Sequence, residues 1–326
     1  MPSSRVTIRD VARAAGVSRQ TVTRAINEMP DISEETRRRV MQKVESLGYR
    51  PNRFAIDLSR QRTHAVGLVV GTFRNPYYGQ LADSFIDELQ RRDWQVLVGT
   101  SEQGESRTIR SMMAQVDGIV GYLDQLPEGF VQEARGLPLV QLEQRADAAG
   151  MHSVELDLRS GILDLVSALR AKGARRFGMI DTPGPLPEES GGSPRRQYFE
   201  EAVGVPCTVV SEPESIAGGA NGLRALLDRD PEIDTVLAFN DMMAMGAVHG
   251  AHTLRLDVPD RLRIVGIDGL SLGEAISPTL TTLSSEPHVM ATEAASILAD
   301  VFAGGMNPSA PICRVVTPVV VWRESA

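Results

Sequence analysis

VTIRDVARAAGVSRQTVTRAIN, residues 6–27, has the pattern of two short amphipathic helices that meet at a glycine. The first helix carries one apolar stripe at the i, i+3, i+4 and i+7 spacing, made of Ile8, Val11, Ala12 and Ala15. Thr7 and Asp10 predict an aspartate version of the capping box at its start. Gly16 supplies the permissive backbone of the turn, and Ser18 is placed to cap the second helix. The stretch therefore predicts a helix-turn-helix.

The second helix has an apolar face and a polar face. Val22, Ala25 and Ile26 are expected to face inward. The opposite face and its border carry hydrogen-bonding side chains, namely Arg19, Gln20, Thr23, Arg24 and Asn27. Arginine and glutamine present the paired donors and acceptors that distinguish base edges in the major groove of DNA. We expect this helix to read DNA, and a plain helical hairpin with a solvated polar face is the alternative.

The net charge of −8 is divided unevenly along the chain. Residues 1–63 carry 13 Lys and Arg against 7 Asp and Glu, a balance of +6, and the remainder has a balance of −14. Attraction to phosphate depends on charge within about 8 Å, the Debye length. A basic head can therefore bind DNA while an acidic body stays away from it, and the asymmetry indicates two domains with different partners.

The composition is that of a globular protein, with 42% hydrophobic and 23% charged residues in 326. No apolar run is long enough to span a membrane, and the N-terminal residues show no signal-peptide core, so we expect a cytoplasmic protein. Cys207 and Cys313 form no zinc-type cluster and are expected to be reduced thiols.

A third helix is expected to begin at Ser33, where Glu34 and Glu35 suit the positive end of a helix, and to close at Gly48. Residues 49–63 follow as a linker with the pattern of one short helix. Because a lone helix of that length is hardly populated in water, we expect this linker to fold only when something docks against it.

From His64 onward, apolar strands alternate with amphipathic helices. The expected strands are 65–71, 94–100, 117–123, 137–143, 175–181, 235–241 and 263–268. This rhythm predicts parallel sheets covered on both faces, and the number of strands favours two Rossmann-like lobes facing a cleft. Ligands in such folds bind beyond the carboxyl ends of the strands. The Gly218–Gly222 segment is interpreted as a loop that leads into a helix.

Taken together, the chain resembles the LacI/GalR family of bacterial transcription regulators over essentially its whole length. The resemblance rests on TIRDVARAAGVSRQTVTRAIN, Tyr49-Arg-Pro-Asn52, Asn75-Pro-Tyr-Tyr78, Phe239-Asn-Asp241 with Met243-Ala244 and Gly246, Val265-Gly-Ile-Asp268 and Leu280-Thr-Thr282. The later motifs are weak individually, but their order and spacing behind the helix-turn-helix are specific.

The resemblance implies an all-α helix-turn-helix headpiece and an α/β core shaped like periplasmic sugar-binding proteins, with two Rossmann-like lobes. The expected domains are residues 1–50 for the headpiece, 51–63 for a hinge helix or linker and 64–326 for the effector-binding and dimerisation core. Within the core, the first lobe is expected at about 64–157 plus 286–304, and the second at about 158–283 plus 306–326. The resemblance also implies a homodimer on a pseudopalindromic operator in the bacterial nucleoid, and it leaves a tetramer open.

Matched residue by residue, three side chains would read bases: Arg19, Gln20 and Arg24. A second set would contact phosphates or sugars: Thr7, Ser18, Thr21, Thr23, Asn27, Thr36 and Tyr49. Contacts of the second kind fix the register of a protein on DNA, whereas base contacts give sequence preference. In the linker, Asn52, Ala55 and Leu58 would form a hinge at the minor groove, with Leu58 as a wedge that bends the duplex.

Arg195, Asn240 and Asp268 match family positions that hydrogen-bond an effector, and Tyr77 or Phe239 could pack against its ring. The alternative is that Asn240 and Asp268 only cap the segments that follow them. This chain departs from the family pattern in Arg195-Arg-Gln-Tyr198-Phe199, so Arg196 could point inward instead, and also in Glu143-Gln144-Arg145. A sugar is the first expectation for the effector, with a phosphorylated sugar, nucleoside or other metabolite left open.

The alternatives to a ligand-responsive repressor are an enzyme and a transport-type binding protein. No dinucleotide fingerprint, P-loop or nucleophile–base pair stands out, and we expect no cofactor. His249 and His252 share the spacing of a metal pair but have no evident third and fourth ligands, so we expect no metal. The basic helix-turn-helix argues against a pure transport protein.

Overall fold

The computed structural model describes residues 6–26, 29, 31–47, 65–134, 136–146, 148, 150–183, 192–304 and 311–326. The chain divides into two compact units, Met1–Ala65 and Val66–Ala326. The linker predicted at 51–63 lies outside the described residues, and each unit is described by itself.

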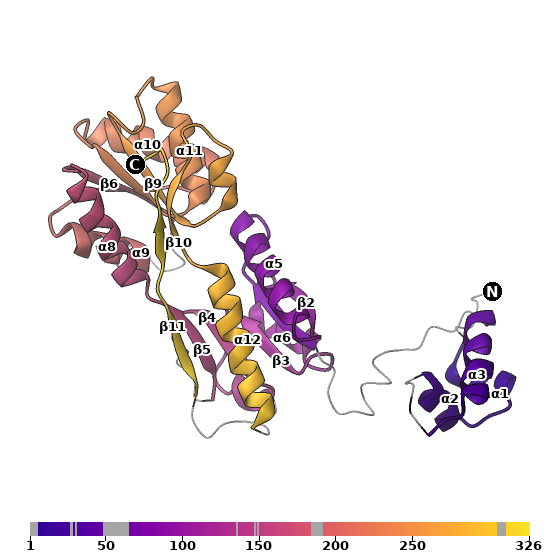
Figure 1. The fold of residues 1–326 in the computed structure, drawn as a ribbon. Coiled ribbons are helices and arrows are strands. Elements are labelled where there is room, and N and C mark those ends of the chain that lie inside the picture. Colours follow the sequence, from indigo (N-terminus) through magenta and orange to yellow (C-terminus); the bar gives the residue numbers. More distant parts are fainter. Residues whose placement is uncertain are drawn as a thin grey trace. The chain divides into compact units, whose positions relative to one another are not determined.

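The described residues of the first unit, which we call the headpiece, form three helices, labelled α1 to α3 in Figure 1. They are α1 (Ile8–Ala15), α2 (Arg19–Ile26) and α3 (Glu34–Ser46). The apolar stripes predicted from the sequence meet in one small core, in which Val11, Val22 and Val40 are fully buried. Gly16 takes the left-handed conformation with a φ of 65°, which lets α1 end and α2 begin within three residues.

The second unit, the core, contains two six-stranded sheets. The first sheet has the order β11-β5-β4-β3-β1-β2. Its strands are β1 (Ala65–Val70), β2 (Gln95–Thr100), β3 (Gly118–Gly121), β4 (Leu139–Glu143), β5 (His152–Leu156) and β11 (Cys313–Val316). The pairings of β1 with β3, β3 with β4, β4 with β5 and β5 with β11 are parallel.

The second sheet has the order β12-β10-β9-β8-β6-β7. Its strands are β6 (Phe177–Asp181), β7 (Thr208–Ser211), β8 (Thr235–Ala238), β9 (Arg263–Asp268), β10 (Thr281–Ser284) and β12 (Val319–Val321). The short strand β12 runs antiparallel to β10, and the pairs β6–β7, β6–β8, β8–β9 and β9–β10 are parallel.

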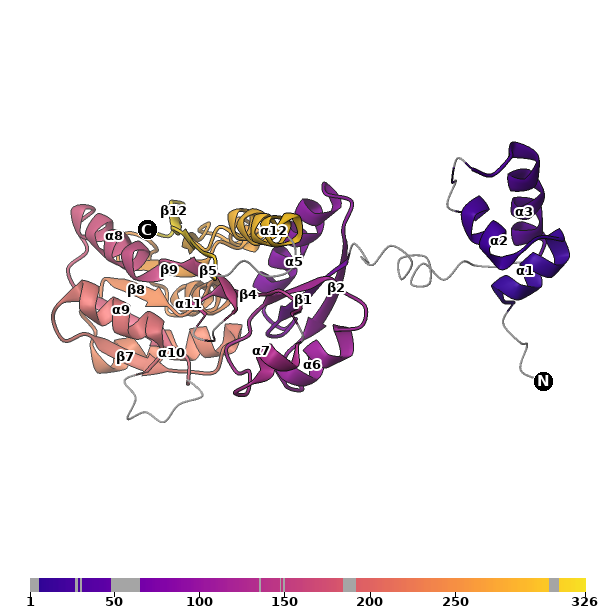
Figure 2. The same ribbon diagram turned by 90° about the horizontal axis from the view of Figure 1, so that it is seen from below.

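Helices cover both sheets, which explains the continuous apolar runs of the strands (Figures 1 and 2). The first sheet carries α5 (Pro76–Gln90), α6 (Glu105–Met112), α7 (Phe130–Glu133) and α12 (Pro287–Ala303). The second carries α8 (Leu158–Ala171), α9 (Pro194–Val203), α10 (Ile216–Arg229) and α11 (Asp241–Thr253). The predicted α/β architecture of two lobes with largely parallel sheets is therefore confirmed.

The chain crosses between the lobes after β5, after β10 and between β11 and β12. The last crossing corrects the expectation that all of residues 306–326 belong to the second lobe. Strand β11 instead pairs with β5 in the first sheet, and only β12 joins the second. Thr317 and Pro318 separate them, and proline has no amide hydrogen with which to continue a ladder.

The Gly218–Gly222 segment is also different from its sequence interpretation. It lies within α10, which begins at Ile216 and is capped by Ser215.

Among the described residues, no helix combines the length and the apolar character that a membrane crossing requires.

Candidate DNA-reading surface and effector site

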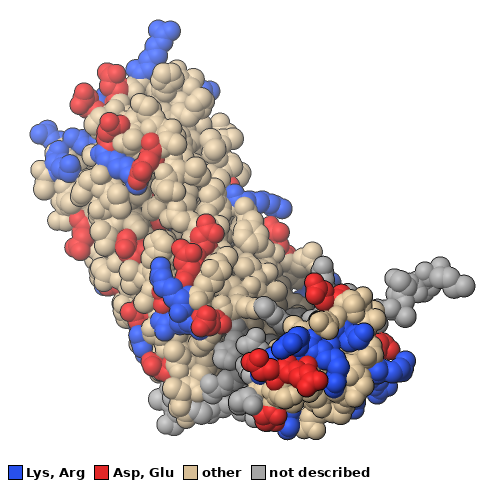
Figure 3. All heavy atoms as spheres, turned by 45° about the vertical axis from the view of Figure 1, so that its right-hand side comes forward, with Lys and Arg blue, Asp and Glu red and all other residues tan. Residues whose placement is uncertain are grey.

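The helix α2 presents the proposed base-reading residues of the headpiece. Arg19 and Gln20 are exposed in its first turn, and Arg24 is half-exposed one turn further on. Figure 3 shows lysine and arginine side chains gathered on the forward face of the headpiece, beside a group of acidic ones. Arg24 forms an ion pair with Asp31, with 2.8 Å between Nη1 and Oδ2.

Hydroxyl groups at the helix ends make local hydrogen bonds. At α1, the backbone amide of Thr7 donates to the Asp10 carboxylate, as the capping box predicts, and the Thr7 hydroxyl donates to the same carboxylate. At α2, the Ser18 hydroxyl accepts from the amide of Thr21, and Thr23 donates to the carbonyl of Arg19. These hydrogen bonds stabilise α1 and α2, and α2 carries Arg19 and Arg24.

Thr36, another of the proposed phosphate contacts, lies in the first turn of α3, where its amide donates to Ser33 Oγ. Several residues proposed for DNA contact lie outside the described residues: Asn27, Tyr49, Asn52, Ala55 and Leu58. Their roles remain predictions.

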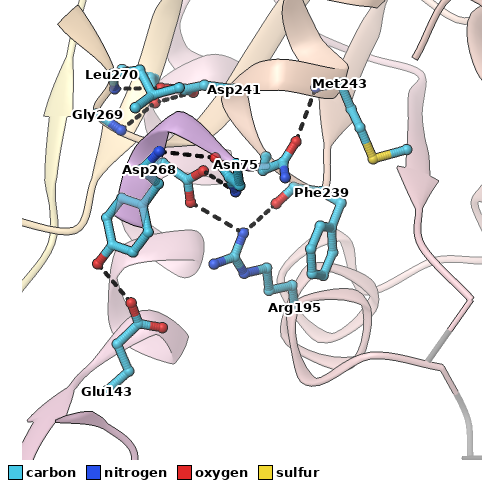
Figure 4. Close-up of polar contacts among 12 residues, drawn as sticks. Asn75, Glu143, Arg195, Phe239, Asp241, Met243, Asp268, Gly269 and Leu270 are labelled. Atoms are coloured by element: carbon cyan, nitrogen blue, oxygen red, sulfur yellow. Dashed lines mark hydrogen bonds and ion pairs between the residues drawn. The ribbon is translucent and has the colours of Figure 1, made fainter. Parts of the chain in front are cut away.

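In the core, polar and aromatic side chains from both lobes meet beyond the carboxyl ends of the parallel strands (Figure 4). We call this set the interlobe cluster: Asn75, Tyr77, Tyr122 and Glu143 from the first lobe, and Arg195, Glu214, Phe239, Asn240 and Asp268 from the second. Glu143 is the last residue of β4 and Asp268 the last of β9. The fold therefore places the cluster where α/β sheets bind ligands.

Arg195 faces the cluster from the first turn of α9. Its Nη1 donates to the carbonyl oxygen of Phe239 and lies 3.5 Å from Oδ1 of Asp268 (Figure 4). The guanidinium also stacks on the Phe239 ring, 4.5 Å from the centroid. The neighbouring Arg196 pairs instead with Glu200 on its own helix, so Arg195 is the arginine that faces the cluster.

Asp268 is the most deeply buried carboxylate of the cluster, and its side chain is 2% exposed. Its Oδ2 lies 3.5 Å from the amide nitrogen of Asn75, a residue of the other lobe. Burial raises the pKa of Asp268 well above its ordinary value, although the charge of Arg195 acts to lower it.

The turn after Asp268 is held by Asp241, the first residue of α11. Asp241 accepts hydrogen bonds from the amide of Leu270 at 2.6 Å and from the hydroxyl of Thr282 at 2.5 Å. Burial raises the pKa of Asp241 to about 6 against these hydrogen bonds. The loop is therefore capped by Asp241, and Asp268, with a φ of 134°, turns its carboxylate to Arg195 and Asn75.

Asn240 has two partners. Its Oδ1 accepts from the amide of Met243 and caps α11, which is the capping alternative drawn from the sequence. Its Nδ2 donates to Oε1 of Glu214 at 2.8 Å. The same glutamate oxygen accepts from Asn75 at 3.0 Å, so Glu214 links the two lobes.

In the first lobe, Glu143 accepts from two tyrosines, of which Tyr77 is buried and Tyr122 half-buried. The hydroxyls of Tyr77 and Tyr122 donate to its Oε1 at 2.7 and 2.5 Å. Burial, followed by the charge of Glu143, raises the pKa of both hydroxyls well above the ordinary value. The ring of Tyr78 packs edge-on against both, with centroids 5.5 Å from Tyr77 and 5.3 Å from Tyr122.

A glutamine joins the lobes beside the cluster. Gln80 of α5 donates to the carbonyl of Gly269 and accepts from the amide of Ser271, both at 3.1 Å. Between these two partners, Leu270 of the second lobe is buried in the apolar core of the first. The described conformation therefore has the lobes in direct contact.

Sequence reasoning singled out Tyr77, Arg195, Phe239, Asn240 and Asp268, and the structure brings all five into the cluster. It did not single out the binding partners Asn75, Tyr122 and Glu214, and it noted Glu143 only as a departure from the family pattern. Each lies near the carboxyl end of a strand, which was the available signal: Glu143 ends β4, Tyr122 directly follows β3, and Asn75 and Glu214 lie in the segments after β1 and β7. In the described part of the chain, no group of three or more His, Cys, Asp or Glu side chains is arranged to hold a metal ion.

A helix-turn-helix headpiece joined to a two-lobed core with polar side chains between its lobes defines a class of protein, the ligand-responsive DNA-binding regulator. A sequence model of bacterial regulatory proteins of the lacI family matches residues 7–52, and one of the periplasmic binding protein-like domain matches residues 166–326. The transcriptional regulator DegA of Bacillus subtilis is 31% identical over 302 residues, 89% of each chain. GalR of Escherichia coli is 30% identical over 335 residues, 98% of this chain and 95% of its own.

Among solved structures, a complex of the regulator CelR with cellobiose has a TM-score of 0.68 at 28% identity and covers 99% of this chain and 100% of its own. The lac repressor dimer bound to operator has a TM-score of 0.80 at 20% identity, covers 99% of each chain and supports the fold alone. This chain belongs to the LacI/GalR family of bacterial transcription regulators. Its role is therefore regulation of transcription and not catalysis.

Proposed function

We propose that this regulator is a repressor that binds a pseudopalindromic operator as a homodimer. A sugar-like effector binds the interlobe cluster and either lowers or raises the affinity for the operator. Two features carry the proposal together: an exposed arginine- and glutamine-bearing helix in the headpiece, and a polar cluster shared by two lobes in the core, in which Asn75, Asn240 and Asp268 are buried.

In the headpiece, Arg19, Gln20 and Arg24 would contact base edges. Thr7, Ser18, Thr21, Thr23 and Thr36 would contact the backbone, as would Asn27 and Tyr49. Asn52, Ala55 and Leu58 would form the minor-groove hinge. Helix-turn-helix proteins bind half-sites about one helical turn apart as dimers, because a dimer presents two recognition helices to successive grooves.

In the core, the effector would bind between Arg195, Asp268 and Asn240 on one side and Tyr77 on the other, with Phe239 as an apolar wall. Polyol hydroxyls both donate and accept, and carboxylate, amide and guanidinium groups satisfy both roles. Solved family relatives hold lactose, cellobiose and ribose. An effector that contacts both lobes stabilises one arrangement of them, and linkage then changes the affinity for DNA by the same factor in reverse.

The DNA-binding half is tested by selecting duplexes from a random library with the full-length protein. We expect enrichment of sequences with two inverted half-sites. As the salt concentration rises, binding to the selected duplexes should persist after binding to random duplexes is lost. Failure to enrich any duplex at any ionic strength would contradict the proposal. Enrichment of a single half-site would retain the DNA reader but overturn the dimer.

A further inference from the structure

The interlobe cluster holds more negative than positive charge. Glu143, Glu214 and Asp268 contribute three carboxyl groups within it, and Arg195 contributes the guanidinium that faces them. The imbalance affects the hydroxyl of Tyr78. Burial raises its pKa first, all three carboxylates raise it further, and the charge of Arg195 lowers it. If Asp268 is protonated, the two glutamates of the cluster still outnumber its one guanidinium.

The Nη1 group of Arg195 already has partners. It donates to the Phe239 carbonyl and lies 3.5 Å from Asp268, and the guanidinium stacks on the Phe239 ring. A ligand phosphate that approached Arg195 would lie beside Asp268 as well. Because juxtaposed like charges weaken binding, this geometry opposes an anionic ligand.

Hydrogen-bonding capacity points in the same direction. The protein's own donors near the cluster, the amides of Asn75 and Asn240 and the hydroxyls of Tyr77 and Tyr122, already donate to carboxylates. The carboxylates keep further lone pairs for a ligand. The described hydrogen bonds of Arg195 use Nη1, so its Nε and Nη2 are donors for a ligand beside these carboxylate acceptors. The complementary ligand therefore both donates and accepts, as a sugar hydroxyl does.

We propose that the interlobe cluster selects a saccharide that carries no phosphate or carboxylate group, and discriminates against the phosphate ester of the same sugar. Sugar hydroxyls donate to carboxylates, whereas a phosphate dianion can only accept. This selectivity rests on the proposed function, which assigns effector binding to the cluster, and it narrows the effector from any sugar-like molecule to an uncharged saccharide.

The test measures binding to the full-length protein by calorimetry and thermal shift with matched probes. These are galactose, glucose, ribose, lactose and cellobiose, with galactose 6-phosphate, glucose 6-phosphate and ribose 5-phosphate. We expect a neutral sugar to bind and its phosphate ester to bind at least about tenfold more weakly. A phosphate ester that binds more tightly than its parent sugar would overturn the selectivity while leaving an effector role intact.

A charge-matched pair of variants distinguishes exclusion of the phosphate ester by charge from its exclusion by shape. Glu214→Gln removes one negative charge from the cluster, and Glu232→Gln removes one from the exposed segment before β8, at the other end of the strand. The ratio of the two dissociation constants, ester over parent sugar, should fall severalfold in Glu214→Gln and stay the same in Glu232→Gln.

Equal ratios in both variants would show that shape, not charge, excludes the ester, and would overturn the inference. If none of the probes binds although the protein still selects operator DNA, both the selectivity and the effector role of this cluster are wrong.

Discussion

At the scale of single residues, Arg24 is held in place within the headpiece itself. Its ion pair with Asp31 joins side chains that are 43% and 50% exposed. Pairs as exposed as this stabilise a fold by about 1 kcal/mol or less. Arg24 can therefore exchange Asp31 for a guanine edge at small cost.

Replacing Arg24 or Asp31 should give opposite results. Arg24→Ala should weaken binding to a selected operator by about 1–3 kcal/mol and remove preference at one base pair, because a base contact is lost. Asp31→Asn should strengthen binding to operator and random duplexes alike, by about fivefold at low salt, because a carboxylate near phosphates is neutralised. Fluorescence anisotropy with both duplexes measures each. A loss of operator preference in Asp31→Asn would instead make Asp31 a positioning residue for Arg24.

The residues of the cluster illustrate what a sequence can predict. Arg195, Asn240 and Asp268 were identifiable because each lies in a motif or at the end of an apolar run. Asn75 and Glu214 are 139 residues apart and belong to different lobes. Their contact depends on how two lobes close on each other, and no local pattern encodes it.

At the scale of secondary-structure elements, glycines permit the close approach of α10 and α11. A Cβ atom on Gly219 would lie 1.9 Å from the carbonyl oxygen of Met243, and one on Gly246 would lie 2.0 Å from that of Ile216. Since α11 begins directly after Asn240, this packing also positions the cluster.

Gly219→Ala should therefore destabilise the core by about 1–3 kcal/mol or more, because the backbone must shift to admit the methyl group. Thermal denaturation measures the loss. Gly79→Ala in α5 is the control, since no atom beyond its chain neighbours and the local helix backbone lies within 4 Å of the added methyl group and the helix should gain up to about 1 kcal/mol. Equal melting temperatures for both variants would show that the two helices are not closely packed at Gly219.

Glu105, the first residue of α6, should make stability depend on pH. Burial raises its pKa from an ordinary 4.5 to about 7, although the amide of Gln125 donates to it. The folded state therefore keeps a proton that the unfolded state loses, and this group's contribution to stability falls as pH rises from about 4.5 to about 7. Above that range the cost is complete and constant.

Glu105→Gln keeps the acceptor oxygen and removes the ionisation. The variant and the parent should have similar free energies of unfolding near pH 4.5, and the variant should become the more stable of the two by pH 8. Denaturant unfolding across this range measures the difference. Parallel curves would mean that Glu105 ionises without cost to the fold.

The elements most visible in the sequence were the long ones. Strands such as β1 and β9 have continuous apolar runs, and each was predicted within a residue of its bounds. Residues 306–326 are expected in one lobe, whereas the run 313–321 is divided at Thr317 and Pro318 between two sheets. Apolar periodicity does not reveal which sheet a short strand joins.

At the scale of the whole molecule, both the charge pattern and the fold indicate that the headpiece and the core bind different ligands. The basic headpiece sequence suits a polyanion, and the acidic core encloses a cluster that suits an uncharged polyol. Within the core, Gln80 and Leu270 join the lobes directly, so a ligand between the lobes competes with or reinforces existing contacts. In the proposed function, effector binding by the core changes operator binding by the headpieces through the arrangement of the two lobes.

The most direct test of this coupling is the dissociation constant for the selected operator, measured with and without the neutral sugar that binds the core. We predict a change of about 5- to 150-fold in the wild-type protein, an equal reciprocal change in sugar affinity, and loss of the response in Asp268→Asn with operator binding retained. An operator affinity that is the same without sugar and at saturating sugar would contradict the account.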